Sequence, residues 1–267
     1  MKFKRIMALA LAGVMAAGCM MMSSCGEKAK VVVAEAESAG EEVINTEAYF
    51  KDMTKTPVDS QKKALVEVQS GTADMAVIDY VMTIGSIGEG TDFSDLKIVE
   101  NQSFAPEQYG IAFRKGSDTV NYVNKAISEM KKDGSLKKIA ENYKLQDLIL
   151  DDEAYDEVKA DESDFEYIKN KGELIIGITY FEPMNFIDEK TKKDSGFEAD
   201  FANAICEKLG VKAKFQEIEW KTKETELASK NIDCIWNGLT ITDERKENMQ
   251  ISTPYMQNKQ VIVEKSK

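Results

Sequence analysis

Short apolar segments alternate with longer amphipathic segments along this chain, and this alternation constrains the fold more than any other feature. Segments such as 75–79 and 174–178 have the apolar content of buried strands. Segments such as 120–132 and 197–209 place apolar residues at helical spacing. Strands that alternate with helices are typical of α/β proteins, so the pattern predicts an α/β fold with largely parallel sheets.

Helix boundaries carry capping signals. Ser38 and Ser163 are each followed three positions later by Glu, as in a capping box. Gly134 and Gly172 stand where a left-handed residue would end a helix. Three expected helices begin at Ser38, Ser163 and near Asp243, and the others span 60–70, 120–132, 136–143, 197–209 and 222–229. The expected strands are 31–34, 75–79, 97–100, 109–113, 174–178, 212–217, 233–237 and 260–263.

The first residues resemble a removable export signal. Three basic residues precede an apolar run at 6–18, which ends in small residues and is too short for a comfortable membrane span. Cys19 and Cys25 each follow small residues, as in the bacterial lipoprotein signal, in which the Cys becomes the lipidated first residue. We favour Cys25, which leaves 1–24 as the signal peptide; Cys19, or a plain secretory signal cleaved elsewhere, is the alternative.

The charge of the chain excludes some partners. Removing 1–24 shifts the net charge from −12 to about −15, and a protein this acidic repels nucleic acid and anionic membrane surfaces. The chain contains no His, which is the commonest general base and metal ligand. Beyond the signal, Cys206 and Cys234 each lie in an apolar run, so we expect two buried free thiols rather than a disulfide.

An acidic segment divides the rest of the chain. Residues 147–166 contain ten acidic residues and one Lys, which predicts a solvated connector. The length that remains after the signal, about 240 residues, is enough for one large core or two modest ones.

The run from Trp236 to Arg245 carries the clearest chemical signal. An apolar strand ends in Gly238 and Thr240, and a short turn then brings Arg245 to the start of a helix. A hydroxyl, exposed backbone groups and a guanidinium fork would thus surround one small volume. That arrangement suits a carboxylate ligand.

Taken together, several motifs resemble the family 3 extracellular solute-binding proteins, the receptors of ABC importers for polar amino acids. The resemblance covers nearly all of the chain after the signal, except the acidic connector. The downstream motifs are Leu174-Ile175-Ile176-Gly177, Phe181-Glu182-Pro183-Met184-Asn185-Phe186, Gly196-Phe197-Glu198-Ala199-Asp200, Asn231-Ile232-Asp233, the segment 238–245 and Ser252-Thr253-Pro254-Tyr255; the upstream motifs are Ser38-Ala39-Gly40-Glu41, the segment 71–79, Tyr109-Gly110-Ile111-Ala112-Phe113 and Lys132-Asp133-Gly134.

The order of these motifs departs from the family, because the block with the Arg motif comes first there and last here. The chain therefore resembles a circularly permuted member whose former ends are joined by the acidic connector; a mis-assembled or tandem gene fragment is the alternative. The resemblance implies a two-lobe, type II periplasmic-binding-protein-like α/β fold with a central cleft. Its implied parts are a small lobe at 29–109, a large lobe at 114–150 and 164–258, and hinge strands at 109–113 and 259–264.

The resemblance also implies a site for the two charged groups of an α-amino acid. Arg245 would bind the carboxylate through two parallel hydrogen bonds, helped by the helix start at Ser38 and Ala39. Asp79, at the end of an apolar strand, would pair with the ammonium. The other implied ligand-binding residues are Gly238 and Thr240, which complete the shell, and Phe181 and Trp220, whose rings sandwich the ligand.

Without the resemblance, these residues have ordinary structural roles. Arg245 would be a surface residue that balances Glu244 and Glu247, Asp79 would cap a turn, and the aromatic residues would belong to the core. Glu198 and Asp200 are expected to hold a loop or helix start and not to touch the ligand.

The implied function is a lipid-anchored, monomeric receptor on the outer face of a bacterial cell membrane, which delivers a polar amino acid to an ABC permease. No catalytic residue, metal or cofactor is expected. Glu35, Glu182 and Asn185 could reach a ligand side chain, whereas Ile178 lies near where cation-selecting relatives carry an acid, which favours a neutral polar amino acid. The alternatives are a dehydratase for small carboxylic acids, with Glu182 or Glu35 as general acid, and a ligand sensor for a separate signalling receptor.

Overall fold

The computed structural model describes residues 29–102, 104–160 and 163–266. The predicted signal peptide 1–24 and the predicted lipidation sites Cys25 and Cys19 lie outside these residues. Within the described ranges, none of the helices combines the length and the apolar content needed to cross a membrane.

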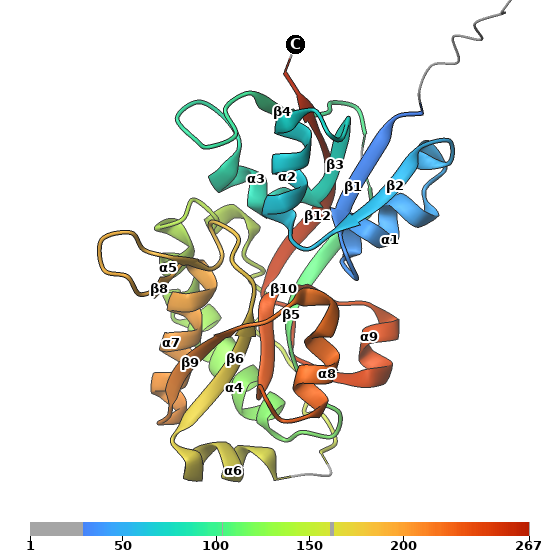
Figure 1. Ribbon diagram of the computed structural model, residues 1–267. Helices are drawn as coiled ribbons and strands as arrows, with labels where there is room; N and C mark the ends of the chain where they lie inside the picture. The colour runs from blue at the N-terminus through green and yellow to red at the C-terminus, as the bar shows by residue number, and fades with distance from the viewer. Residues whose placement is uncertain (1–28, 103, 161–162, 267) are drawn as a thin grey trace, which may run out of the picture.

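Two α/β lobes lie one above the other in Figure 1. In the upper lobe, α1 begins after Ser38, whose hydroxyl accepts a hydrogen bond from the Glu41 N–H at 3.1 Å. The expected capping box forms only in part, because the Glu41 carboxylate accepts from the N–H of Glu37 instead of Ser38. The strands of this lobe are β1 (Val31–Glu35), β2 (Thr54–Val58), β3 (Met75–Asp79) and β4 (Leu96–Ile98), and its helices are α1 (Ala39–Thr46), α2 (Gln61–Ser70) and α3 (Tyr80–Ser86).

The lower lobe contains the larger set of elements. Its sheet has the strand order β5-β10-β6-β9, and α7 packs against α4 and α5 beside it. The strands are β5 (Pro106–Arg114), β6 (Glu173–Ile178), β9 (Lys212–Glu217), β10 (Cys234–Thr240) and β11 (Met249–Ile251), with a hairpin of β7 (Phe186–Ile187) and β8 (Asp194–Ser195); the helices are α4 (Thr119–Lys132), α5 (Ser135–Glu141), α6 (Asp164–Lys171), α7 (Phe197–Leu209), α8 (Lys223–Ala228) and α9 (Asp243–Asn248).

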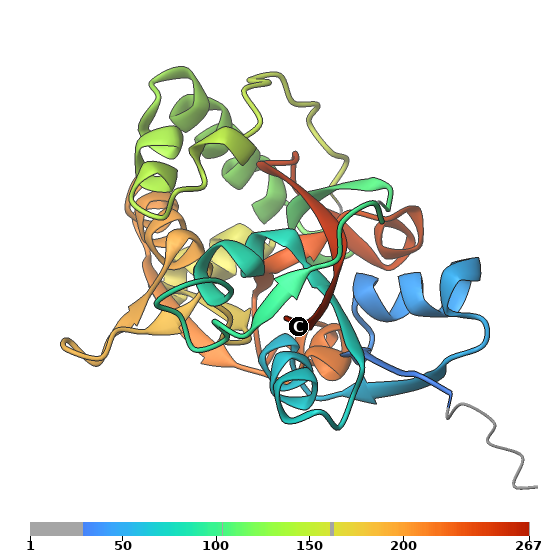
Figure 2. The same cartoon turned by 90° about the horizontal axis from the view of Figure 1, so that it is seen from above.

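Strand β12 (Met256–Lys265) joins the two lobes. Its first part pairs with β5 and its second part pairs with β3, so both halves belong to one continuous sheet. Figure 2 shows β12 running through the middle of the molecule. The expectation of largely parallel sheets is wrong here, because every pair that involves β5 or β12 is antiparallel. The two strands that cross between lobes run in opposite directions, one leaving the upper lobe and the other returning to it.

The core of the lower lobe is built around aromatic rings. Phe201 packs edge-on against Trp236 with ring centroids 5.0 Å apart and lies 5.5 Å from Tyr255. Cys206 and Cys234 are both buried and free in this core, which confirms the prediction of two free thiols.

A network of buried charges holds the lower lobe together at the end of β5. Arg114 Nε donates to Asp164 at 2.8 Å, and Arg114 Nη1 donates to the carbonyl of Ile232 at 2.8 Å. Asp233, at the start of β10, accepts from Lys171 Nζ at 2.6 Å and lies 3.5 Å from Arg114 Nη2. Because these groups come from β5, α6 and β10, the network fixes three separate segments against one another.

The predicted acidic connector lies along α4. Asn121 exchanges two hydrogen bonds with the backbone of Val158, at 2.9 and 2.8 Å, and Lys131 Nζ donates to the carbonyl of Asp152 at 2.8 Å. Most of 151–160 is exposed, as predicted. The prediction of a solvated segment is wrong at its far end, since Asp164 is buried against Arg114.

Candidate functional site

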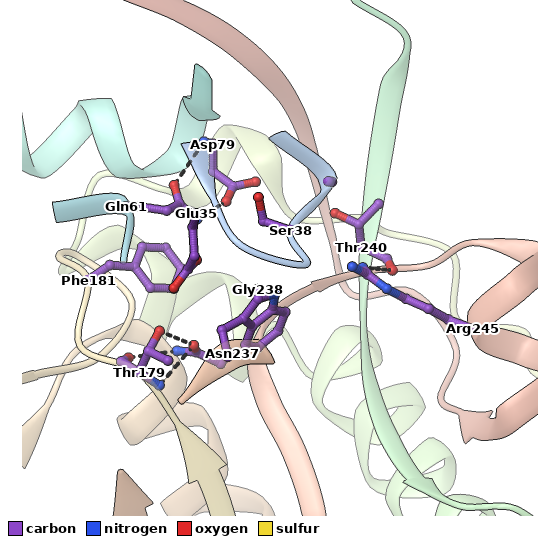
Figure 3. A pocket seen from close by; sticks show the side chains of 12 residues that line it. Glu35, Ser38, Gln61, Asp79, Thr179, Phe181, Asn237, Gly238, Thr240 and Arg245 are labelled. Carbon is purple, nitrogen blue, oxygen red and sulfur yellow. Dashed lines mark hydrogen bonds between the residues drawn. The ribbon is translucent and has the colours of Figure 1, made fainter. Parts of the chain in front are cut away.

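One pocket between the lobes contains all eight residues predicted to bind the ligand (Figure 3). It lies at the carboxyl ends of strands from both lobes, because Glu35 ends β1, Asp79 ends β3 and Thr240 ends β10. This edge is where α/β sheets bind ligands, since loops and helix starts meet there. The lining residues are Glu35, Ser38, Ala39, Gln61, Asp79, Thr179, Phe181, Trp220, Asn237, Gly238, Thr240 and Arg245.

Arg245 reaches the pocket from the first turn of α9. Thr242 caps this helix, because its hydroxyl accepts from the Arg245 N–H at 3.2 Å. The guanidinium donates to the carbonyl of Thr240 at 2.7 Å and to that of Glu37, in the upper lobe, at 3.5 Å. Among the residues that the structure covers, it forms no ion pair with a carboxylate within 4.0 Å. Its charge is therefore available to an anionic group.

Asp79 lies across the pocket from Arg245 and is held by amide groups. Its carboxylate accepts from the side-chain amides of Gln61, Asn258 and Gln260, the last at 2.9 Å. Burial raises the pKa of Asp79, whereas these hydrogen bonds act in the opposite direction. The carboxylate thus has a fixed orientation but no cationic partner among the described side chains.

A second carboxyl group lies behind Asp79. Glu107 Oε2, on β5, accepts from Asn258 and Gln260 at 3.0 Å each and from the Thr240 hydroxyl at 3.1 Å. Burial and the neighbouring Asp79 raise the pKa of Glu107 to about 7. The Thr240 hydroxyl, which was predicted to contact the ligand, therefore donates to Glu107 in this structure.

Ser38 and Ala39 lie at the start of α1, at the edge of the pocket. The Ser38 hydroxyl acts as the N-cap of the helix. Ala39 is the first helical residue, and N–H groups in the first turn have no partner inside the helix. This helix start faces the same space as Arg245 and Thr240 (Figure 3).

Phe181 and Trp220 form apolar walls. Gly238 is in the left-handed region, with φ 56°, and an added Cβ would lie 3.0 Å from the Phe181 ring. The Gly238 N–H donates to Glu198 at 2.8 Å, and Glu198 also accepts from Asn185 at 2.7 Å. Glu198 therefore positions Gly238 from behind.

The space left between the lining side chains is narrow. It amounts to about 10 Å³, which is room for about one water molecule. A wider groove of about 720 Å³ adjoins it at Phe181, between the 82–93 segment of the upper lobe and the 180–190 segment of the lower lobe. An amino acid can occupy the pocket only if the two lobes move apart or side chains shift.

Sequence reasoning missed several polar groups at the site. Gln61, Thr179 and Asn237 line the pocket, and Asn258 and Gln260 hold Asp79 from β12. The predicted hinge strand 259–264 contains Gln260 but begins after Asn258. Their two-residue spacing, which places both side chains on one face of a strand, was an available signal. Asn237 stands next to Gly238 in the recognised motif, but nothing in the sequence reveals that its amide pairs with Thr179.

Comparison with known proteins places the downstream half of the site in a family. Residues 174–267 match the model of bacterial extracellular solute-binding proteins, family 3. Over these residues the chain is similar to that family. The same residues supply Phe181, Trp220, Gly238, Thr240 and Arg245 to the pocket.

Three curated relatives that the chain matches in part are named for the amino acids they bind. The chain is 37% identical to the L-cystine-binding protein TcyJ of Escherichia coli strain K12 over 97 residues, which is 36% of each chain. It is 31% identical to the L-cystine-binding protein TcyA of Bacillus subtilis strain 168 over 99 residues, which is 37% of each chain. It is 32% identical to the glutamine-binding protein of Geobacillus stearothermophilus over 114 residues, 41% of this chain and 44% of that protein. The matched part thus spans well under two thirds of these relatives.

Solved structures align with this chain over a similar share. The arginine-bound form of domain 1 from TmArgBP aligns with 33% identity and a TM-score of 0.33, covering 37% of this chain and 84% of that one. The ancestral amino-acid-binding protein AncCDT-1, a precursor of cyclohexadienyl dehydratase, aligns with 33% identity and a TM-score of 0.30, covering 32% and 38%.

Proposed function

We propose that this protein is the extracytoplasmic receptor of an ABC importer and binds a polar L-amino acid between its two lobes. The observation that carries the proposal is the placement of Asp79 and Arg245, from different lobes, in one pocket. The relatives named for binding cystine and glutamine support an amino acid as ligand.

Binding follows from pairing each charge of the ligand. The carboxylate is bound by Arg245 and by the start of α1, and the ammonium is bound by Asp79, with the Gly238 carbonyl nearby. Burying a charged group without a partner costs roughly several kcal/mol. The ligand therefore needs Arg245 and Asp79 at the same time. Phe181 and Trp220 exclude water from the complex.

Lobe movement about β5 and β12 would admit the ligand. The two strands pair with each other between the lobes, so bending there separates Asp79 from Arg245. The groove beside Phe181 is the route that the structure offers to the pocket. A ligand that contacts both lobes favours the closed form, which a membrane permease can then recognise.

We also propose a lipid anchor at Cys25, or at Cys19, on the outer face of the cell membrane, for a receptor that acts as a monomer. The intact mass of detergent-extracted protein tests the anchor: a mass increase equal to a diacylglyceryl group with an acyl chain supports it. A measured mass equal to that of the unmodified mature chain would overturn the proposed lipid anchor.

The first prediction is that purified protein binds L-amino acids without changing them. Isothermal titration calorimetry with a panel of the common amino acids should give a dissociation constant in the micromolar range or below for at least one, about −8 kcal/mol or better. Mass spectrometry should then recover the same molecule. No binding by any member of the panel would overturn the proposed function, and a product of altered mass would favour the dehydratase alternative.

We further propose that the chain is a circular permutation of the family arrangement. The start of β1 and the end of β12 lie at the same end of the upper sheet, since Val32 and Glu264 both pair with Met75. They are thus about 10 Å apart, or two strand spacings. A short linker can bridge that distance.

The second prediction follows from this spacing. The test uses a reordered chain that starts at Asp164, runs to Lys265, continues through a short Gly-Ser linker to Val31 and ends at Leu150. This chain should fold and should bind its ligand within about threefold of the original affinity. Circular dichroism and calorimetry measure both properties. A control opened inside α7, at Ala204, should fail to fold. A reordered chain that is as unfolded as this control would count against the permutation.

A further inference from the structure

Glu35 is the one carboxyl group in the pocket that no part of the described protein satisfies. Its side chain is 4% exposed, and its Oε1 atom is buried without a hydrogen-bond partner. Burial raises the pKa of Glu35 to about 8, and the nearby Asp79 adds to this shift. In contrast, Asp79 and Glu107 each accept several hydrogen bonds from amide or hydroxyl groups.

The position of Glu35 separates it from the groups assigned to the ligand backbone. In Figure 3, Arg245 and Thr240 lie on one side of the pocket, with Ser38 between them and Asp79. Glu35 extends towards the other side, where Phe181, Thr179 and Asn237 lie. Thr179 and Asn237 satisfy each other through hydrogen bonds of 2.6 to 2.9 Å. Glu35 is therefore the acidic group left for a ligand side chain.

The charges that line the pocket do not balance for a neutral amino acid. The lining contains two carboxyl groups, Glu35 and Asp79, and one guanidinium, Arg245. A zwitterion matches Asp79 with its ammonium and Arg245 with its carboxylate, which leaves Glu35 unmatched. The Glu35 carboxyl can therefore ionise in this buried position only beside a group of opposite charge.

We propose that Glu35 determines specificity, and that the ligand's side chain ends in a cationic nitrogen group, ammonium or guanidinium, seated between Phe181 and Trp220 against the Glu35 carboxyl. This assignment rests on the proposed function and names the ligand class of the same pocket. The two aromatic walls suit a cation, because their ring faces attract positive charge.

The charged neighbours of Glu35 do not supply this partner. Lys223 Nζ donates to the Glu37 carbonyl at 3.2 Å and lies 4.9 Å from the Trp220 ring. Its positive charge lowers the pKa of Glu35, but this is the smallest of the causes that act on that pKa. Glu107 is bonded to Asn258, Gln260 and Thr240, and Arg245 is bonded to two backbone carbonyls. A ligand cation is therefore the missing partner.

Proton release gives a signature of this pairing. Near pH 7 the free protein holds a proton on Glu35, since its pKa is about 8. A cation beside the carboxyl lowers that pKa, so binding at pH 7 should release up to about one proton. Affinity should therefore rise with pH up to about 8 and level off above it.

The third prediction concerns the preference of the protein among amino acids. It is tested by isothermal titration calorimetry at pH 7 with L-lysine, L-arginine, L-glutamine and L-glutamate. The wild-type protein should bind L-lysine or L-arginine at least about 30-fold more tightly than the other two. Glu35→Gln should remove most of this preference, with a loss of about 30-fold for the cationic ligands and under about threefold for L-glutamine. Repeating the titrations in buffers of different ionisation enthalpy should show proton release that Glu35→Gln abolishes.

Glu47→Gln is the matched control, because Glu47 is an exposed Glu of the same lobe whose side chain has no hydrogen bond or ion pair among the described residues. It should leave both the preference and the proton release unchanged. Preference of the wild-type protein for L-glutamine or L-glutamate would overturn the assignment while leaving the receptor function in place. Absence of binding to every amino acid would instead overturn the receptor function. Should Glu35→Gln fail to fold, the wild-type preference and its proton release still decide the question.

Discussion

Arg245→Ala is expected to weaken binding of the preferred amino acid by more than about 100-fold, because the ligand carboxylate would be buried without its cation. The loss corresponds to about 3–5 kcal/mol, as for other buried charge pairs that lose one partner. Isothermal titration calorimetry measures it. Arg245→Lys should retain part of the affinity, since a single ammonium replaces the charge but not the two parallel hydrogen bonds.

Lys246→Ala is the control for this experiment. Lys246 is the next residue of α9, and among the described residues its exposed side chain forms only a surface ion pair with Asp243 at 3.7 Å. Its removal should change the affinity by less than about threefold, because screened surface pairs contribute little. If Arg245→Ala bound like the wild-type protein, Arg245 would not be the carboxylate partner.

Arg114→Ala is expected to lower the free energy of unfolding by about 3–5 kcal/mol, because it leaves Asp164 and Asp233 buried with less compensation. The substitution also removes hydrogen bonds to the carbonyls of Ile232 and Leu227. Urea denaturation followed by circular dichroism gives the change in midpoint and in free energy.

The network lies at the start of β10, whereas the pocket lies at the end of this strand, so ligand affinity of folded Arg114→Ala should stay close to normal. Lys214→Ala breaks an exposed ion pair with Glu173 at 3.0 Å and should cost less than about 1 kcal/mol. Equal, small losses in both variants would show that the buried network contributes no special stability.

Local sequence patterns predict most of this fold. The strand 75–79 and the helix 197–209 occur with the expected bounds, because an apolar run and a helical repeat are properties of a short segment. β2 escapes prediction because its sequence is largely polar and contains Pro57, and its side chains are mostly exposed or half-buried. α3 also escapes prediction, because it begins directly after β3 with no loop residue between them to indicate a helix start.

Relations between distant segments were harder to predict. The eight residues predicted to bind the ligand were brought together by resemblance to a family, and the structure gathers them in one pocket. The amide shell of Asp79 involves Asn258 and Gln260, which are 179 and 181 residues away. No spacing rule connects such positions, and the same holds for the antiparallel pairing of β5 with β12.

The amide shell of Asp79 has a consequence for how fast a ligand can be captured. Gln61 on α2 and Gln260 on β12 bind the carboxylate, and Gln260 pairs with Asp79 across the β3–β12 ladder, so this part of the shell belongs to one rigid body. Rotation of the other lobe leaves it intact. In the proposed receptor, the open form would therefore present an acceptor already aligned for an incoming ammonium, and little conformational entropy would be lost at that point on encounter.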